Sequence, residues 1–163
     1  MRLQEILKEG TPDRLEWCYA EIASHARQII EMTEKAMVQY AKPGAAALDQ
    51  RQADAYIHEL RRLIDVSVEA AGLIDRKSGA EELERMVDTY QRKNQDYGDS
   101  FAGTMERFGL VAGAVRIHDK VSRMLTLKGR EGLVADESMG DTLRDLGTYA
   151  AMVTGWIKSE REE

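Results

Sequence analysis

Cysteine is nearly absent from this sequence: Cys18 is the only one among 163 residues. A single cysteine excludes both an internal disulfide and a zinc–thiolate cluster. The sequence also lacks an apolar run of the roughly 20 residues that a helix needs to span a bilayer, and its N-terminal segment lacks the apolar core of a signal peptide. We therefore expect a cytoplasmic protein with no membrane partner.

Proline and aromatic residues are scarce as well. The chain has two prolines and 6% aromatic residues, whereas Ala, Leu, Glu, Arg, Met and Gln are plentiful, which favours helices over strands. Runs of basic residues are absent and the net charge is −6, so strong binding to nucleic acids is not expected. Free nucleotides remain compatible with this charge, because a metal ion can carry their phosphates.

The first half of the chain predicts two long helices. Thr11-Pro12-Asp13 has an N-cap residue, a first-position proline and an acidic first turn, and the apolar face that follows ends at Lys42-Pro43-Gly44. A second amphipathic helix is predicted from about Ala46 to Arg76. The two form a long N-terminal αα-hairpin, which cannot bury its apolar faces alone. We therefore expect residues 1–78 to pack on the rest of the chain or to form a homo-oligomer.

Residues 79–163 are expected to form a second helical unit. Helices are predicted at Ala80–Asp96, around Thr104–Phe108, at Leu110–Lys128 and from a cap at Asp136. The fold class is thus an all-α helical bundle. The apolar periodicity of two of these helices predicts the inward residues, namely Leu83, Met86, Val87 and Tyr90 on one, and Val111, Val115, His118, Ser122 and Leu125 on the other.

Three carboxylates share one arc of the last helix: Glu137, Asp141 and Asp145 lie four residues apart. Like charges at this spacing repel, so basic side chains or a divalent cation with oxygen ligands must offset them. The other interpretation is a solvated face whose acidic first turn suits the helix dipole.

Charged residues also gather on the preceding helix, where they admit three interpretations. They pair with the acidic face, they hold phosphate, or they are solvated. These residues are Arg116, Asp119, Lys120 and Arg123.

The segment KNQDYGDSF, residues 93–101, admits two interpretations. Gly98 is suited to a turn, with Tyr97 or Phe101 filling the core. Alternatively, Tyr97 or Phe101 stacks on a nucleobase while Lys93 and Asp96 make polar contacts.

Three blocks stand in order along the chain: KNQDYGDSF, RIHDKVSR and DESMGDTLRDLGTYA. Over roughly residues 85 to 157 this arrangement resembles the nucleotide-modification-associated domain family of bacteriophages and mobile elements. The third block is also similar to a metal-binding helix of the all-α nucleoside triphosphate pyrophosphatases, the MazG and dimeric dUTPase group. Its spacing, Glu137-x-x-x-Asp141, differs from the E-x-x-D of that group, and the preceding helix offers only Asp119 where that group has three glutamates.

These resemblances imply a nucleotide-metabolism protein that binds a (deoxy)nucleotide with Mg²⁺, and suggest hydrolysis of a nucleoside triphosphate to a monophosphate and pyrophosphate. Asp119, Glu137 and Asp141 would hold the metal, and Asp145 would orient or deprotonate the attacking water. The alternative is a non-catalytic helical binding or assembly module, associated with nucleotide or DNA modification or with a phage structure. The expected substrate-binding residues are Lys93, Asp96, Tyr97, Arg116, Lys120 and Arg123.

Overall fold

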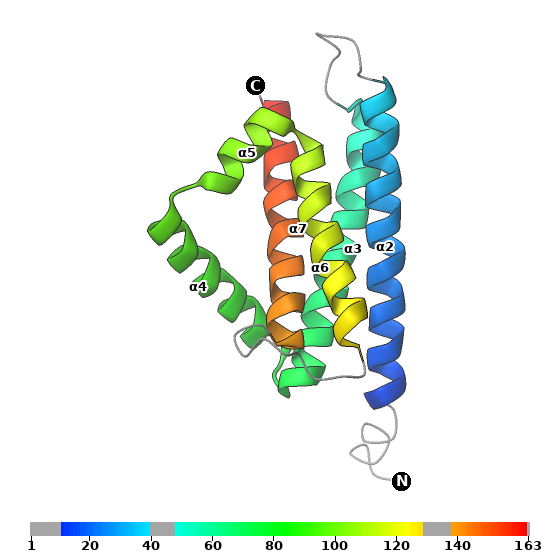
Figure 1. The fold of residues 1–163 in the computed structure, drawn as a ribbon, viewed down its shortest axis with the longest axis vertical. Coiled ribbons are helices and arrows are strands. Elements are labelled where there is room, and N and C mark those ends of the chain that lie inside the picture. The colour runs from blue at the N-terminus through cyan, green and yellow to red at the C-terminus, as the bar shows by residue number, and fades with distance from the viewer. Residues whose placement is uncertain (1–10, 40–47, 129–137, 163) are drawn as a thin grey trace.

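The computed structural model describes residues 11–39, 48–128 and 138–162, and these residues form helices with no strand among them (Figure 1). This confirms the predicted all-α helical bundle. No helix in the described ranges is long and apolar enough to cross a membrane. The helices are α2 (Thr11–Gln39), α3 (Gln50–Asp75), α4 (Gly79–Tyr97), α5 (Ser100–Phe108), α6 (Leu110–Leu127) and α7 (Met139–Glu162).

The four long helices α2, α3, α6 and α7 run side by side along the long axis of the molecule (Figure 1). Helix α7 packs mainly against α3 and α6, and α2 packs against the same two helices. One apolar core joins them, so it draws residues from both sides of position 78. Among its fully buried large side chains are Ile22, Ile29, Tyr56, Leu60, Leu63, Ile117, Met124, Leu143 and Leu146.

Helix α4 departs from this parallel arrangement. It starts beside the lower end of α7 and inclines away from the bundle, and α5 then leads back toward the upper end of α7 (Figure 1). Between them Gly98 has a φ of 65°, a backbone conformation that favours glycine. The predicted turn at Gly98 is confirmed, and the detour leaves room between α4, α5 and α7.

Side-chain caps fix where several helices begin. Ser78 and Glu81 form the expected capping box at the start of α4. Helix α5 begins at Ser100, earlier than the predicted Thr104, because the Asp99 side chain accepts a hydrogen bond from the Ala102 amide at 3.2 Å. The predicted helix stop at Lys42-Pro43-Gly44 and the cap at Asp136 lie outside the described residues.

The predicted inward faces of α4 and α6 are partly wrong. On α4, Met86 is buried and Tyr90 half-buried, but Leu83 and Val87 are exposed, because the buried face of the tilted helix runs through Glu82 and Met86. On α6, Val115, His118, Ser122 and Leu125 are exposed. The stripe that faces the core is the neighbouring one, because it offers the larger apolar side chains to α2 and α7; it includes Ile117, Val121, Met124 and Leu127.

Candidate functional site

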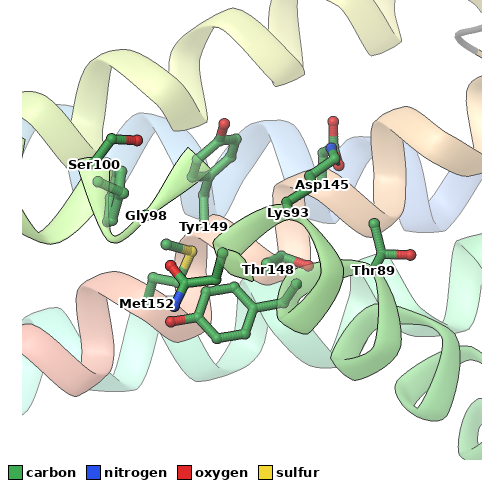
Figure 2. A pocket seen from close by; sticks show the side chains of 11 residues that line it. Thr89, Lys93, Gly98, Ser100, Asp145, Thr148, Tyr149 and Met152 are labelled. Carbon is green, nitrogen blue, oxygen red and sulfur yellow. The ribbon is translucent and has the colours of Figure 1, made fainter. Parts of the chain in front are cut away.

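A pocket of about 200 Å³ lies where α4 and α5 separate from α7 (Figure 2). Figure 2 shows Lys93 and Asp145 next to each other at one end of it and Gly98 and Ser100 at the other. It is lined by Thr89, Tyr90, Lys93 and Asn94 of α4, by Gly98, by Ser100 and Phe101 of α5, and by Asp145, Thr148, Tyr149 and Met152 of α7.

A buried ionic cluster holds the first turns of α4 against the bundle. The Nη1 atom of Arg144 donates to Asp75 and, at 3.0 Å, to Glu82, whose side chain is fully buried. Arg85 donates to the same two carboxylates at 2.8 and 2.9 Å. The start of α4 is therefore joined to the end of α3 and the start of α7, which fixes the wall of the pocket that carries Lys93.

The opposite wall of the pocket belongs to α7, whose Asp145 contacts lysines of both α4 and α6. The Nζ atom of Lys93 lies 3.5 Å from Oδ1 of Asp145, and the Nζ atom of Lys120 on α6 lies 2.8 Å from Oδ2. Asp145 and Lys120 are largely buried, with 24% and 18% of their side-chain surface exposed, whereas Lys93 is mostly exposed. Three of the predicted site residues therefore meet at Asp145, each from a different helix. Lys93 and Asp145 line the pocket, whereas Lys120 contacts Asp145 without lining it.

Aromatic rings form much of the remaining surface. The centroids of Phe101 and Tyr149 lie 5.4 Å apart with the ring planes tilted by 48°. This is a favourable geometry for an aromatic pair. Tyr90 lines the pocket from α4, and Asn94 and Thr148 supply polar groups beside the rings. Phe101, one of the two predicted stacking residues, is thus placed at the pocket.

Asp141 lies one turn before Asp145, and both of its carboxylate oxygens are engaged. Oδ2 accepts hydrogen bonds from the amide and hydroxyl of Ser138, and Oδ1 accepts from Nη2 of Arg144 at 2.5 Å. Partial burial alone would raise the pKa of Asp141, but the hydrogen bonds from Arg144 and Ser138 outweigh it and hold the pKa below its ordinary value. Asp141 therefore serves as an ion-pair partner and helix cap.

The pKa of Arg144 is perturbed in the opposite direction. Burial alone lowers it, and the hydrogen bonds to Asp141, Asp75 and Glu82 outweigh that effect and raise it above its ordinary value. The guanidinium is therefore a fixed positive charge among three carboxylates.

The other charged residues of α6 differ in their exposure. Arg116 is exposed and Arg123 is half-buried, and neither lines the pocket. Asp119 is exposed, with its carboxylate 3.9 Å from Nδ1 of His118. Lys120 of this group contacts Asp145, which lines the pocket, although Lys120 itself does not.

The expected metal ligands do not converge in the described residues. No group of three acidic, histidine or cysteine side chains suited to a metal ion occurs in the parts of the chain that the structure describes. Asp119 is exposed, and Asp141 is held by Arg144 and Ser138. The magnesium site stays a prediction, because its third expected ligand is not among the described residues. Glu137 lies outside the described residues, as do the side chains of Asp96 and Tyr97, and their predicted roles stay predictions.

No family model, curated protein or solved structure matches this chain. The resemblances to the nucleotide-modification-associated domain family and to the all-α pyrophosphatases therefore remain predictions.

A second pocket, of about 250 Å³, lies toward the other end of the bundle. Apolar side chains from α2, α6 and α7, such as Met37, Leu110 and Trp156, line most of it. None of the predicted site residues reaches it, so the pocket beside Asp145 is the better candidate for a polar ligand.

Sequence reasoning missed Arg144, Asp75, Glu82 and Asn94. Asp75 and Glu82 approach Arg144 across 69 and 62 positions of the chain, a distance that helical spacing cannot reveal. Asn94 carried a usable signal, since it stands beside Lys93 in the KNQDYGDSF block.

Proposed function

We propose that this protein binds a nucleotide in the pocket between α4, α5 and α7. The observation that carries the proposal is that the aromatic rings of Phe101 and Tyr149 line one pocket together with Lys93. A second lysine, Lys120, lies next to this pocket, in contact with Asp145 of its lining. A planar base stacks favourably on such rings, and ammonium groups attract phosphate. The three-block resemblance adds independent support for a nucleotide ligand.

The size of the pocket suggests how the ligand lies. About 200 Å³ accommodates a base, while a sugar and phosphates extend toward Lys93 in its lining and toward Lys120, which contacts Asp145 beside it. Asn94 and Thr148 offer donors and acceptors at the edge of a stacked base. These contacts account for binding and require no metal ion.

Binding is tested by titrating the protein with nucleosides, nucleoside monophosphates and triphosphates in a thermal-shift assay and by calorimetry. A specific ligand stabilises the native state by mass action, so the melting temperature rises with its concentration. Phe101→Leu should weaken binding about 5- to 150-fold, since stacking on an aromatic ring contributes roughly 1–3 kcal/mol per base. The matched control is Phe108→Leu, at the exposed end of α5 and outside this pocket. Equal effects of the two variants, or no binding to the wild type, would contradict the proposal.

Hydrolysis of a nucleoside triphosphate is the activity that the resemblance suggests for this site, with Mg²⁺ held by Glu137 and neighbouring carboxylates. The assay measures pyrophosphate release from a nucleotide panel with and without Mg²⁺. Asp141→Asn should abolish any release if Asp141 becomes a ligand in the loaded enzyme. Binding without release would restrict the function to nucleotide recognition.

A second candidate function is a non-catalytic assembly module. It is supported by large apolar side chains that the fold leaves exposed, among them Val87 on α4 and Val115 and Leu125 on α6. This candidate predicts self-association without any shift in melting temperature on addition of nucleotides.

A further inference from the structure

The most unusual feature of the site is that its two lysines, Lys93 and Lys120, both contact one carboxylate. Asp145 is the residue that both lysines approach, and it uses a different carboxylate oxygen for each. The lysines come from α4 and α6, on either side of α7. A carboxylate between two ammonium groups has the charge and the oxygen acceptors that a phosphate group would present at the same place.

We infer that Lys93 and Lys120 form a phosphate-binding subsite and that the Asp145 carboxylate occupies it as an internal counter-anion until a ligand phosphate displaces it. The inference deepens the proposed function, since it specifies how the phosphate end of the nucleotide is bound, and it assigns Asp145 a role other than that of a base. An arriving phosphate exchanges one set of ion pairs for another, and no bond is formed or broken.

The geometry of the two contacts supports this exchange. Lys120 is largely buried and makes the shorter contact, whereas Lys93 is 61% exposed and lies at 3.5 Å. Lys93 can therefore turn from Asp145 to a ligand at low cost, because an exposed ion pair contributes little stability. Lys120 then stays as the fixed charge, and the Asp145 side chain rotates toward solvent. About a quarter of its surface is already exposed.

The competition has a measurable cost in affinity. When an internal anion fills the subsite for most of the time, the apparent affinity for an external anion falls by the fraction of time that the subsite is open. A subsite that is open for about a tenth of the time binds roughly tenfold more weakly than an open one. Removing the carboxylate should therefore strengthen anion binding, whereas loss of a catalytic base would leave binding nearly unchanged and loss of a positioning residue would weaken it.

The experiment measures binding of inorganic pyrophosphate by calorimetry at low ionic strength, where charge interactions are least screened. Asp145→Asn keeps the shape of the side chain, and we expect it to bind pyrophosphate about tenfold more tightly than the wild type. The matched control is Asp88→Asn on the exposed face of α4, where Asp88 pairs with Arg92 in the same helix. It makes the same change in net charge and should bind as the wild type does.

Two further variants keep the test decisive. Adding Lys120→Gln to Asp145→Asn should abolish the gain, which shows that the anion uses this subsite. If Asp145→Asn unfolds, judged by its melting curve, Asp145→Ser replaces it, because this change also removes the carboxylate. Unchanged or weaker pyrophosphate binding by the folded variant, or a gain that survives Lys120→Gln, would overturn the inference.

Pyrophosphate separates this inference from the proposed function, because it carries no base. Tight pyrophosphate binding by Asp145→Asn with no binding of any nucleotide would refute the proposed function and keep the phosphate subsite. Nucleotide binding by the wild type with no gain in Asp145→Asn would keep the proposed function and refute the inference.

Discussion

Two arginines contact the same pair of carboxylates in this protein but differ in exposure. Only 10% of the Arg144 side chain is exposed, against 40% for Arg85, and both donate to Asp75 and Glu82. Glu82 is fully buried, so its charge depends on these partners for compensation. We therefore expect the ion pairs of the buried Arg144 to contribute more to stability than those of the half-exposed Arg85.

Replacing either arginine by methionine tests that distinction. Arg144→Met leaves Glu82 charged and buried with a weaker partner, and should cost about 3–5 kcal/mol of unfolding free energy in urea titrations. Arg85→Met removes a half-exposed contact and should cost about 1 kcal/mol or less. Similar losses for the two variants would contradict the dominant role of Arg144.

Asp141 predicts a pH dependence of stability. Its pKa is lower in the folded protein than its ordinary value, so the ionised carboxylate stabilises the fold above about pH 4, and this contribution is lost as the pH falls through the folded pKa. Asp141→Asn should therefore be less stable than the wild type at pH 7, by about 1 kcal/mol or less because Asp141 is half exposed.

Urea titrations at pH 7, 5 and 3 measure this gap, which should close as the pH decreases. Asp88→Asn serves as the control for loss of an exposed carboxylate and should show a small, nearly constant gap. A gap for Asp141→Asn that widens in acid would have the wrong sign.

At the level of single residues, the sequence predicted part of the site. Lys93, Lys120 and Asp145 were predicted as site residues because each lies in one of the three sequence blocks and because helical spacing groups charged residues around the last two. The structure brings these three side chains together. The sequence interpretation assigned Asp141 to a metal, which stays a prediction, and it did not weigh the pairing of Asp141 with Arg144 that their spacing on one helix allows. Ionic partners from distant helices are decided by tertiary packing.

Among the elements, α6 shows the limit of periodicity. The helix has two apolar stripes, and a helical period identifies both without ranking them. The sequence interpretation chose the stripe through Val115 and Leu125, whereas the core takes the stripe through Ile117 and Met124. Helix boundaries were predicted better, because caps such as Ser78 with Glu81 act locally.

The packing of α6 on α7 depends on a close approach at Gly113. A Cβ atom at this position would lie 2.4 Å from Cγ2 of Val153, a buried and branched side chain with little freedom to move. Gly113→Ala should therefore destabilise the protein by about 1–3 kcal/mol, despite the better helix propensity of alanine.

The control is Gly155→Ala in α7, where no atom lies within 4 Å of the added Cβ, so helix propensity alone acts and stability should rise by up to about 1 kcal/mol. Thermal melts of the two variants give the comparison. A stabilising Gly113→Ala would show that the two helices have more space between them than the structure indicates.

For the whole molecule, the exposed stripe of α6 that includes Val115 and Leu125 offers a surface for the expected homo-oligomer. Its residues recur at alternating steps of three and four, the spacing by which helices pair. Most of them are exposed, and Val115 and Leu125 have 51% and 52% of their surface exposed. The complete stripe consists of Val111, Val115, His118, Ser122 and Leu125.

We expect this stripe to pair with the same stripe of a second copy, because burying it removes apolar surface from water at both copies. Sedimentation equilibrium should then show a dimer for the wild type and a monomer for Val115→Glu with Leu125→Glu, since two glutamates per copy would face their counterparts across the interface. Val38→Glu is the control, because Val38 is an exposed apolar residue on α2, away from this stripe. A wild type that stays monomeric at every concentration would exclude pairing and leave nucleotide binding as the function to pursue.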